Sequence, residues 1–288
     1  MTSERTGERT AEIVTAAGRD PGLEYTLRTA ALFREHGYKV HIPYVKTELP
    51  EWVSAEPCRR PEVEVVLGGD GSIMRASHFA SRAGCPILGI NTGHIGFLSE
   101  ISVDETDRIA DYFDGNYSIE ERRMLQVYQF RNGNLVGRPS SALNDAVITH
   151  GRTAKILDLE VSCSGVTLGK FRADGYIVST PTGSTAYSLS AGGPVVDPEL
   201  RGICLTAICP HSLGARPVVV PDNREIEVKY LGHGGIVSLS VDGSDTAQLE
   251  PGDSVRISLS SDVTKFIRLG NKDKKSFYTR LRDKMSGA

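Results

Sequence analysis

The sequence predicts an α/β domain with a parallel sheet, followed by a mainly antiparallel, sandwich-like β domain and a carboxyl-terminal helix that returns to the first domain. Two observations carry this prediction. Up to about residue 100, short apolar runs alternate with segments of helical periodicity, as in parallel sheets with helical crossovers. From about residue 121, short strand-like segments follow one another with turn residues between them.

The first domain is predicted to hold four strands, at residues 12–16, 38–43, 62–67 and 86–90. A helix with apolar residues at helical spacing begins near Leu23 and stops at Gly37. A second helix, between the last two strands, ends at Gly84, where a left-handed cap is expected. Its apolar stripe runs at steps of three and four: Ile73, Ala76, Ala80 and Ala83.

The second domain is predicted to be an antiparallel sandwich. Its strands are expected at 125–130, 146–149, 156–163, 203–208, 217–220, 225–230, 236–241 and 255–259. Asn132-Gly133 favours a tight hairpin turn after the first of them. A helix at 277–284 is expected to dock on the first domain, which gives predicted domains of 1–120 with 265–288, and 121–264.

Composition narrows the class of protein. A net charge of -3 over 288 residues provides no basic field for nucleic acid or an anionic membrane. No apolar run approaches the roughly 20 residues that cross a bilayer, and the charged amino-terminal segment lacks the apolar core of a signal peptide. The five cysteines are scattered without a Cys-x-x-Cys pair, which fits a reducing compartment. We therefore expect a cytoplasmic protein with neither nucleic-acid nor membrane partners.

The turn Gly68-Gly69-Asp70-Gly71 lies between a buried strand and a helix, at the sheet edge where ligands of open α/β folds bind. Its glycines allow positive φ angles and leave no Cβ in the way, so phosphate oxygens can approach main-chain N–H groups at the start of the helix. Asp70 among such amides indicates magnesium coordination or general-base work, and Arg75 is placed to reach a phosphate. A tight turn whose Asp only caps the next helix is the alternative.

Two further segments carry small polar residues. A second glycine cluster, 91–97, follows the neighbouring strand and favours a site at the same edge. The run 171–193 is rich in hydroxyls and glycines, with helix-start hydroxyls at 182–185 and a ring at Tyr187 on which a base or nicotinamide would stack. A buried small-residue helix is the alternative reading of this run. Asp174 is either a plain turn residue or an acceptor of hydrogen bonds from a ribose diol or an amide. The pair Asn144-Asp145, a side-chain amide next to a carboxylate, is weak evidence alone, since most such pairs form turns.

Taken in order, these motifs resemble the NAD kinase family over roughly residues 60–260. The matching segments are Gly68-Gly69-Asp70-Gly71, 91–98, Leu143-Asn144-Asp145, 174–193, 209–213 and Arg216-Pro217. Diacylglycerol kinases and phosphofructokinases carry turns similar to the first of these, whereas the run 174–193 is highly specific. The family usually has Glu where Asp145 stands and Thr where Ser72 stands, and both changes keep the chemistry.

The resemblance implies ATP-dependent transfer of a phosphoryl group to the 2′-hydroxyl of the adenosine ribose of NAD, with a divalent metal, Mg²⁺ being expected, in a homo-oligomer (dimer or tetramer). It implies that Asp70 accepts the hydroxyl proton and that Gly71 and Arg75 lie near the phosphates. The second domain would then bind NAD and support oligomerisation. The remaining substrate-binding residues implied are Phe97, Asn144, Asp145, Arg172, Asp174, Thr185, Ala186, Tyr187, Ser188, Leu189 and Ser190.

Two other functions stay open on the sequence. One is a kinase of another acceptor, a lipid or a sugar, with the same glycine turn. The other is a regulatory protein that binds NAD without turnover. No Ser-His-Asp or Cys-His motif supports nucleophilic hydrolysis.

Overall fold

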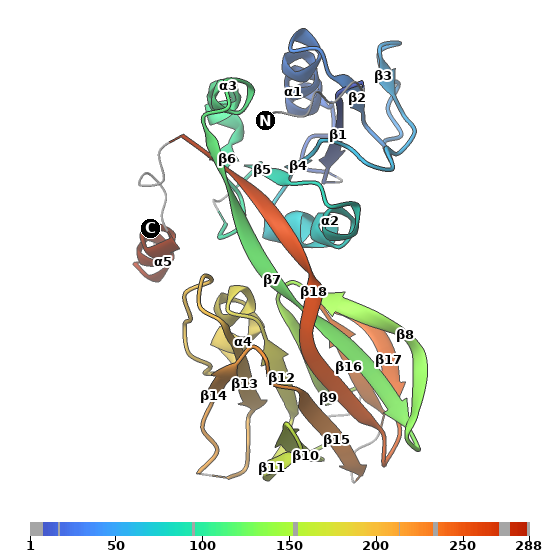
Figure 1. The fold of residues 1–288 in the computed structure, drawn as a ribbon, viewed down its shortest axis with the longest axis vertical. Coiled ribbons are helices and arrows are strands. Elements are labelled where there is room, and N and C mark those ends of the chain that lie inside the picture. Colours follow the sequence, from blue (N-terminus) through green and yellow to red (C-terminus); the bar gives the residue numbers. More distant parts are fainter. Residues whose placement is uncertain are drawn as a thin grey trace, which may run out of the picture. The chain divides into compact units, whose positions relative to one another are not determined.

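The computed structural model describes residues 8–16, 18–93, 96–151, 155–212, 214–232, 236–270 and 277–286. The chain forms two compact units (Figure 1). The first unit comprises Met1–Glu121 and Thr264–Ala288, and the second comprises Arg122–Val263. The motif residues His94, Ile95 and Leu213 lie outside the described part of the chain.

The first unit is built on a parallel sheet, which confirms the predicted fold class. The strands are β1 (Thr10–Thr15), β2 (Lys39–His41), β3 (Val53–Ser54), β4 (Val63–Leu67), β5 (Ile87–Asn91) and β6 (Ile101–Ser102). Their order is β3-β2-β1-β4-β5, and β6 pairs with β5. All of these pairings are parallel. β4 and β5 are buried along their whole length, which explains why most of their residues are apolar.

Helices follow the strands of this unit. They are α1 (Glu24–Glu35), α2 (Asp70–Ala83), the 3₁₀ helix η1 (Val103–Ile109), α3 (Ala110–Phe113) and α5 (Phe277–Met285). α2 buries Ile73, Ala76 and Ala80 as its stripe predicts, and Gly84 ends it in the left-handed conformation at φ 72°. η1 was not predicted, although Ser102 and Glu105 form a capping box at its start.

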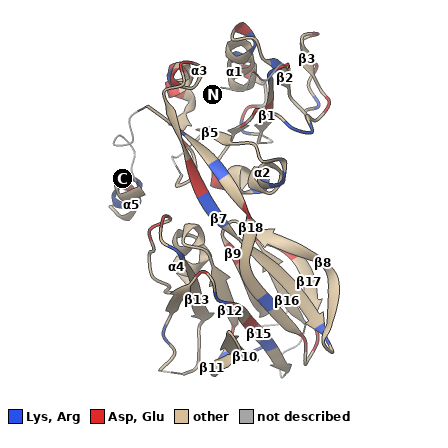
Figure 2. Ribbon diagram, viewed as in Figure 1, with Lys and Arg blue, Asp and Glu red and all other residues tan. Residues whose placement is uncertain are grey.

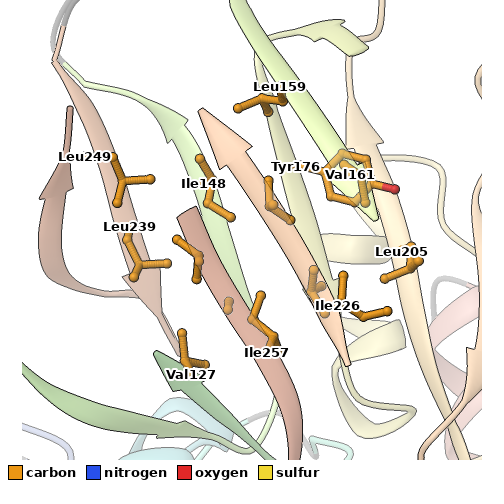
Figure 3. Close-up of a cluster of buried hydrophobic side chains, with 14 of the residues drawn as sticks. Val127, Ile148, Leu159, Val161, Tyr176, Leu205, Ile226, Leu239, Leu249 and Ile257 are labelled. Atoms are coloured by element: carbon orange, nitrogen blue, oxygen red, sulfur yellow. The ribbon is translucent and has the colours of Figure 1, made fainter. Parts of the chain in front are cut away.

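The second unit is antiparallel throughout its assigned pairings. One sheet contains β7 (Tyr117–Arg131), β8 (Asn134–Ala142), β10 (Leu157–Cys163), β11 (Val166–Ala173), β15 (Ile226–Gly232) and β18 (Ser254–Leu269). The other, in the order β14-β13-β12-β9-β16-β17, contains β9 (Asp145–His150), β12 (Gly175–Ser179), β13 (Gly202–Ile208), β14 (Val218–Pro221), β16 (Val237–Val241) and β17 (Ser244–Leu249). Side chains of both sheets, among them Leu159, Tyr176 and Ile257, fill the core of this unit (Figure 3).

The predicted hairpin turn at 132–133 is confirmed, whereas the predicted length of the last strand is wrong. Asn132 and Gly133 have φ angles of 50° and 80°, as the predicted hairpin turn requires. β18 is three times as long as its prediction at 255–259, because Ser260, Ser261 and Asp262 interrupt its apolar pattern without ending the strand. β7 and β18 both continue from one unit into the other. Among the described helices, none has the length and apolar character needed to span a bilayer.

Candidate functional site

The carboxylate of Asp70 is held by two peptide groups. Asp70 is the first residue of α2, directly after the glycines that follow β4. Its Oδ2 accepts a hydrogen bond from the Phe97 N–H at 2.8 Å, and its Oδ1 accepts one from the Leu98 N–H at 3.1 Å. The N-cap of α2 is Gly69, without a side-chain capping bond, so Asp70 does not cap the helix. Each oxygen keeps a lone pair for a further donor.

The glycines around Asp70 serve close packing. A Cβ at Gly96 would lie 1.8 Å from Oδ1 of Asp70, and a Cβ at Gly68 would lie 2.8 Å from the side chain of Ser72. The turn does not use the positive φ angles that glycine allows, since neither Gly68 nor Gly69 nor Gly71 adopts one. Space, and not left-handed backbone, is what the turn requires of Gly68.

Arg75 and Gly71 lie exposed at the start of the same helix. The Arg75 Nη2 donates to Ser72 Oγ at 3.2 Å, which orients the guanidinium along the first turn of α2. This is the only hydrogen bond of the guanidinium within the described part of the chain, which leaves its other N–H groups available for bidentate binding of a phosphate. The amino end of α2 adds the favourable end of a helix dipole.

The second glycine cluster supplies the loop that holds Asp70. Asn91 Oδ1 accepts from the Gly93 N–H at 2.6 Å, and Ser99 Oγ accepts from the Gly96 N–H at 3.3 Å. The Phe97 ring lies 6.0 Å from the ring of Phe277 and 4.5 Å from the Lys284 Nζ, both on α5. Through its N–H Phe97 contacts Asp70, and through its ring it contacts α5.

In the second unit, Asn144 and Asp145 form the entry to β9, and Asp242 holds this entry in place. The Asp242 carboxylate accepts hydrogen bonds from the N–H groups of Leu143 at 2.7 Å, Asn144 at 2.8 Å and Asp145 at 3.1 Å. Asp242 and Gly243 have positive φ angles, 48° and 74°, in the turn between β16 and β17. The predictions missed Asp242, although an Asp-Gly pair between two strands is a hairpin signal.

Asp145 is a buried carboxyl group beside this second carboxylate. Burial raises the pKa of Asp145 to about 7, and the charge of Asp242 contributes to the same shift. Near neutral pH the Asp145 group therefore exchanges between a hydrogen-bond acceptor and a donor.

The hydroxyl-rich run folds back on the same entry. Thr180 follows β12, and its Oγ1 donates to the Leu143 carbonyl at 2.6 Å while accepting from the Gly183 N–H at 3.0 Å. A Cβ at Gly183 would lie 2.2 Å from the Asn144 carbonyl oxygen, so only glycine fits there. The run thus brings 182–185 against Asn144. It forms a 3₁₀ turn, η2 (Thr182–Thr185), and a single helical turn, α4 (Tyr187–Ser190), in place of a longer helix.

Residues of η2 and α4 divide into exposed and buried positions. Tyr187 and Leu189 are 45% and 42% exposed, and Ser190 is exposed as well. Thr185 and Ala186 are half-buried, and Thr185 Oγ1 donates to the Thr182 carbonyl at 3.2 Å. Ser188 is fully buried with its Oγ 3.1 Å from Thr206 Oγ1, so its hydroxyl packs α4 onto β13.

Arg172 and Asp174 lie at the corner between β11 and β12. Arg172 is exposed, and its Nε lies 3.3 Å from an Oδ of Asp158. Asp174 is half-buried; its N–H donates to the Ile208 carbonyl at 2.9 Å and its own carbonyl accepts from Thr149 Oγ1 at 3.2 Å. Both side chains remain within reach of solvent. A ligand-binding role for them stays a prediction.

Comparison with known proteins places these residues in a family. The model of the ATP-NAD kinase N-terminal domain matches residues 51–116, and that of the C-terminal domain matches residues 143–269. The chain belongs to the ATP-NAD kinase family. Among curated NAD kinases, that of Symbiobacterium thermophilum is 45% identical over 227 residues, 77% of this chain and 78% of the relative. That of Heliobacterium modesticaldum is 36% identical over 96% of this chain and 98% of its own.

Solved structures agree with this membership of the ATP-NAD kinase family. The structure of an NAD kinase from Archaeoglobus fulgidus in complex with ATP has a TM-score of 0.69 at 26% identity, covering 96% of this chain and 97% of that one. A yeast NADH kinase complexed with NADH shares the fold, with a TM-score of 0.82 at 24% identity over 96% of this chain and 86% of that one.

Proposed function

We propose that this member of the ATP-NAD kinase family transfers a phosphoryl group from ATP to the 2′-hydroxyl of the adenosine ribose of NAD. The single structural observation that carries the proposal is the fixed Asp70 carboxylate, held by two N–H donors beside the exposed amino end of α2. The curated relatives, NAD kinases at 45% and 36% identity, supply the acceptor.

In the proposed reaction, the 2′-hydroxyl oxygen attacks the terminal phosphorus of ATP and Asp70 takes the hydroxyl proton. The bond between that phosphorus and its bridging oxygen breaks, so the products are NADP, ADP and a proton that Asp70 later releases to water. Asp70 is suited to this role because its two N–H bonds fix the carboxylate while each oxygen retains a lone pair. Phosphoryl transfer otherwise needs position and charge compensation.

Charge compensation is assigned to the start of α2. Gly71 presents no side chain there, and Arg75 presents an exposed guanidinium with one N–H on Ser72. Both features suit phosphate oxygens. Phe97 is assigned a wall position, because its N–H already contacts Asp70.

Recognition of NAD is assigned to the second unit. We propose that Asn144 and Asp145 hold the ribose or adenine, and that Arg172 and Asp174 flank the dinucleotide. The segment 185–190 is proposed to line the nucleoside pocket, with the exposed ring of Tyr187 as a stacking surface. The buried hydroxyl of Ser188 leaves only its main chain for such a contact.

A divalent cation, expected to be Mg²⁺, is assigned to the triphosphate. Among the described residues, no group of three or more His, Cys, Asp and Glu side chains is placed to hold a metal ion. The described residues therefore offer no ready set of protein ligands, and Mg²⁺ commonly enters such sites with substrate phosphates.

A homo-oligomer and a cytoplasmic location complete the proposal. β14 is an edge strand whose Val218 and Val219 are 42% and 47% exposed, which supports assembly. All five cysteines are free, which supports a reducing compartment. Neither a lipid or sugar acceptor nor a regulatory role gains support from the curated relatives, which are NAD kinases.

The test compares wild type with Asp70→Asn in an assay of NADP formation from NAD, ATP and Mg²⁺. We expect the rate of the variant to fall about 100-fold or more, the scale of general-base catalysis. The Asn amino group would face one of the two peptide N–H donors, so the unfolding temperature of the variant is measured alongside. A wild type that binds NAD without turnover would favour the regulatory function, and one that does neither would refute the acceptor.

A further inference from the structure

One peptide group joins the Asp70 carboxylate to a guanidinium on α5. The N–H of Leu98 donates to Oδ1 of Asp70 at 3.1 Å. The carbonyl of the same peptide group, that of Phe97, accepts a hydrogen bond from Arg280 Nη1 at 2.6 Å. Because the peptide group is planar and rigid, fixing its oxygen also fixes the direction of its N–H. Arg280 and Asp70 are therefore hydrogen-bonded to opposite ends of the same peptide group.

Arg280 is itself buried and held. It is 7% exposed, and its Nη2 lies 3.3 Å from Oε2 of Glu100. Burial lowers the pKa of Arg280, and the nearby charge of Arg268 lowers it further, whereas Glu100 acts in the opposite direction. A charge in such a place is costly to bury unless it is paired and hydrogen-bonded. The Phe97 carbonyl is one of the groups that satisfy it.

The next peptide group is held in the same way. Arg268 Nη1 donates to the Leu98 carbonyl at 3.2 Å and lies 3.2 Å from Glu100 Oε2. Arg268 also pairs with Glu120 on β7, where an acidic stretch is followed by a basic one (Figure 2). Arg268 and Arg280 both pair with Glu100. Together they bind the carbonyls of the two peptide groups that follow Phe97 and Leu98, in the loop whose N–H groups hold Asp70. All of these residues belong to the first unit.

A charge-assisted bond at one end of an amide has two effects at the other end. It restricts the orientation of the N–H, and it polarises the amide so that the N–H becomes a stronger donor. Both effects favour one fixed position of the carboxylate, and a displacement of about 1 Å at a catalytic group costs up to roughly 100-fold in rate. If Arg280 only docked α5, its replacement would lower the stability of the protein but would have no separate effect on the position of Asp70.

We propose that Arg280 is a positioning residue for phosphoryl transfer, which acts on Asp70 through the Phe97–Leu98 peptide group. The inference rests on the proposed function only for the role of Asp70. The contact between α5 and the loop is thereby part of the catalytic arrangement, although Arg280 touches no substrate.

The experiment uses the full-length chain and three variants. Arg280→Gln removes the charge, Arg280→Lys keeps a charge and a donor, and Arg282→Gln is the matched control. Arg282 lies on the same helix with a 74% exposed side chain and pairs only with its neighbour Asp283 among the described contacts. For each variant, kcat, the KM values for NAD and ATP and the unfolding temperature are measured.

We expect Arg280→Gln to lower kcat roughly 10- to 100-fold with both KM values within about threefold of wild type. Arg280→Lys should recover part of the loss, and Arg282→Gln should match wild type. In the Asp70→Asn background, Arg280→Gln should cause no further loss, because a residue that acts through Asp70 is non-additive with it. Equal losses in both backgrounds, or an unchanged kcat, would overturn the proposal.

A spectroscopic readout keeps this test separate from turnover. In protein labelled with ¹⁵N-leucine, the Leu98 amide proton should move upfield in Arg280→Gln as its bond to Asp70 weakens, and should not move in Arg282→Gln. An unmoved Leu98 resonance would overturn the inference even if wild type makes NADP. A wild type that makes no NADP would refute the proposed function, while a shifted Leu98 resonance would still support the link between Arg280 and Asp70.

Discussion

Gly96 lies directly against the proposed base. A Cβ on this residue would approach Cγ of Asp70 to 2.2 Å and Oδ1 to 1.8 Å, far inside van der Waals contact. Either the carboxylate or the loop would have to move, and both hydrogen bonds from Phe97 and Leu98 depend on their mutual position. The need for glycine at this position is therefore steric.

We expect Gly96→Ala to lower kcat roughly 100-fold, because it displaces Asp70 without removing any catalytic group. Overpacking of this kind costs about 1–3 kcal/mol, so the variant should still fold. NADP formation and thermal unfolding are the measurements. Gly22→Ala is the control, since a Cβ there meets nothing within 4 Å and Gly22 has no positive φ. Full activity in Gly96→Ala would show that the carboxylate need not occupy its present position.

At this scale the sequence marks a candidate catalytic group but not the contacts that hold it. Asp70 stands out because a carboxylate among glycines before a helix is unusual. Leu98 and Arg280 carry no such mark, because Leu98 acts through its main chain and Arg280 follows Asp70 by 210 positions. Contacts of high sequence separation are set by the fold, and no local pattern in one sequence announces them.

Adjacent strands β1 and β4 bury two carboxyl groups side by side. Glu12 and Glu64 are directly opposite in the parallel pairing, and they are 3% and 2% exposed. Glu12 accepts the Cys58 N–H at 2.6 Å and faces His41 on β2, whereas Oε2 of Glu64 has no hydrogen-bond partner among the described residues. Burial, and then the charge of Glu12, raises the pKa of Glu64 to about 8.

We expect Glu64→Gln to flatten the fall in stability between about pH 4.5 and pH 8. In this window the folded protein keeps a proton on Glu64 that the unfolded chain, with its ordinary pKa of 4.5, has released. Stability from this group is therefore fully present below pH 4.5 and is lost as the pH rises through about 8. Gln mimics the protonated form at every pH, so the variant should lose less stability than wild type as the pH rises.

Thermal unfolding of wild type, Glu64→Gln and the exposed Glu51→Gln across this pH range checks the prediction. The expected difference at pH 9 is on the order of a few kcal/mol. Parallel curves for all three proteins would mean that Glu64 is ionised in the folded state.

Elements with a strong period were predicted closely, and interrupted ones were not. α2 was predicted from its apolar stripe and ends at the predicted Gly84. β18 was predicted to end at Leu259, because the polar residues Ser260, Ser261 and Asp262 interrupt its apolar pattern. η1 and α4 are too short for an apolar period to show. α4 has no side-chain cap and is held by tertiary contacts such as that of Ser188 with Thr206, whereas η1 begins with a capping box that the prediction did not use.

For the whole molecule, the fold class was predicted correctly. It depends on the order of elements along the chain, strands alternating with helices and then strands following strands, and this order can be read from the sequence. The roles assigned to the two predicted domains stay predictions, as does assembly. Edge strands with exposed apolar residues favour association, and β14 presents Val218 and Val219 at such an edge.

We expect light scattering to give a mass two or four times the 31.2 kDa of one chain. The double change Val218→Asp and Val219→Asp should shift the protein to a lighter species, because it places charges in an apolar contact. Changing the exposed Glu225 and Glu199 to Gln serves as the control. A single-chain mass for wild type would refute the assembly, and an unchanged oligomer in the double variant would place the contact elsewhere.

The first unit is discontinuous, since Arg122–Val263 separates its two segments. During translation, the end of β18 at Leu269 and the helix α5 that carries Arg280 leave the ribosome only after the whole second unit has been made. A nascent chain that has completed its glycine turn and its Asp70 still lacks the guanidinium that orients the loop against them. Under the proposed role of Arg280, a polypeptide released before α5 has been made would fall short of full catalytic competence.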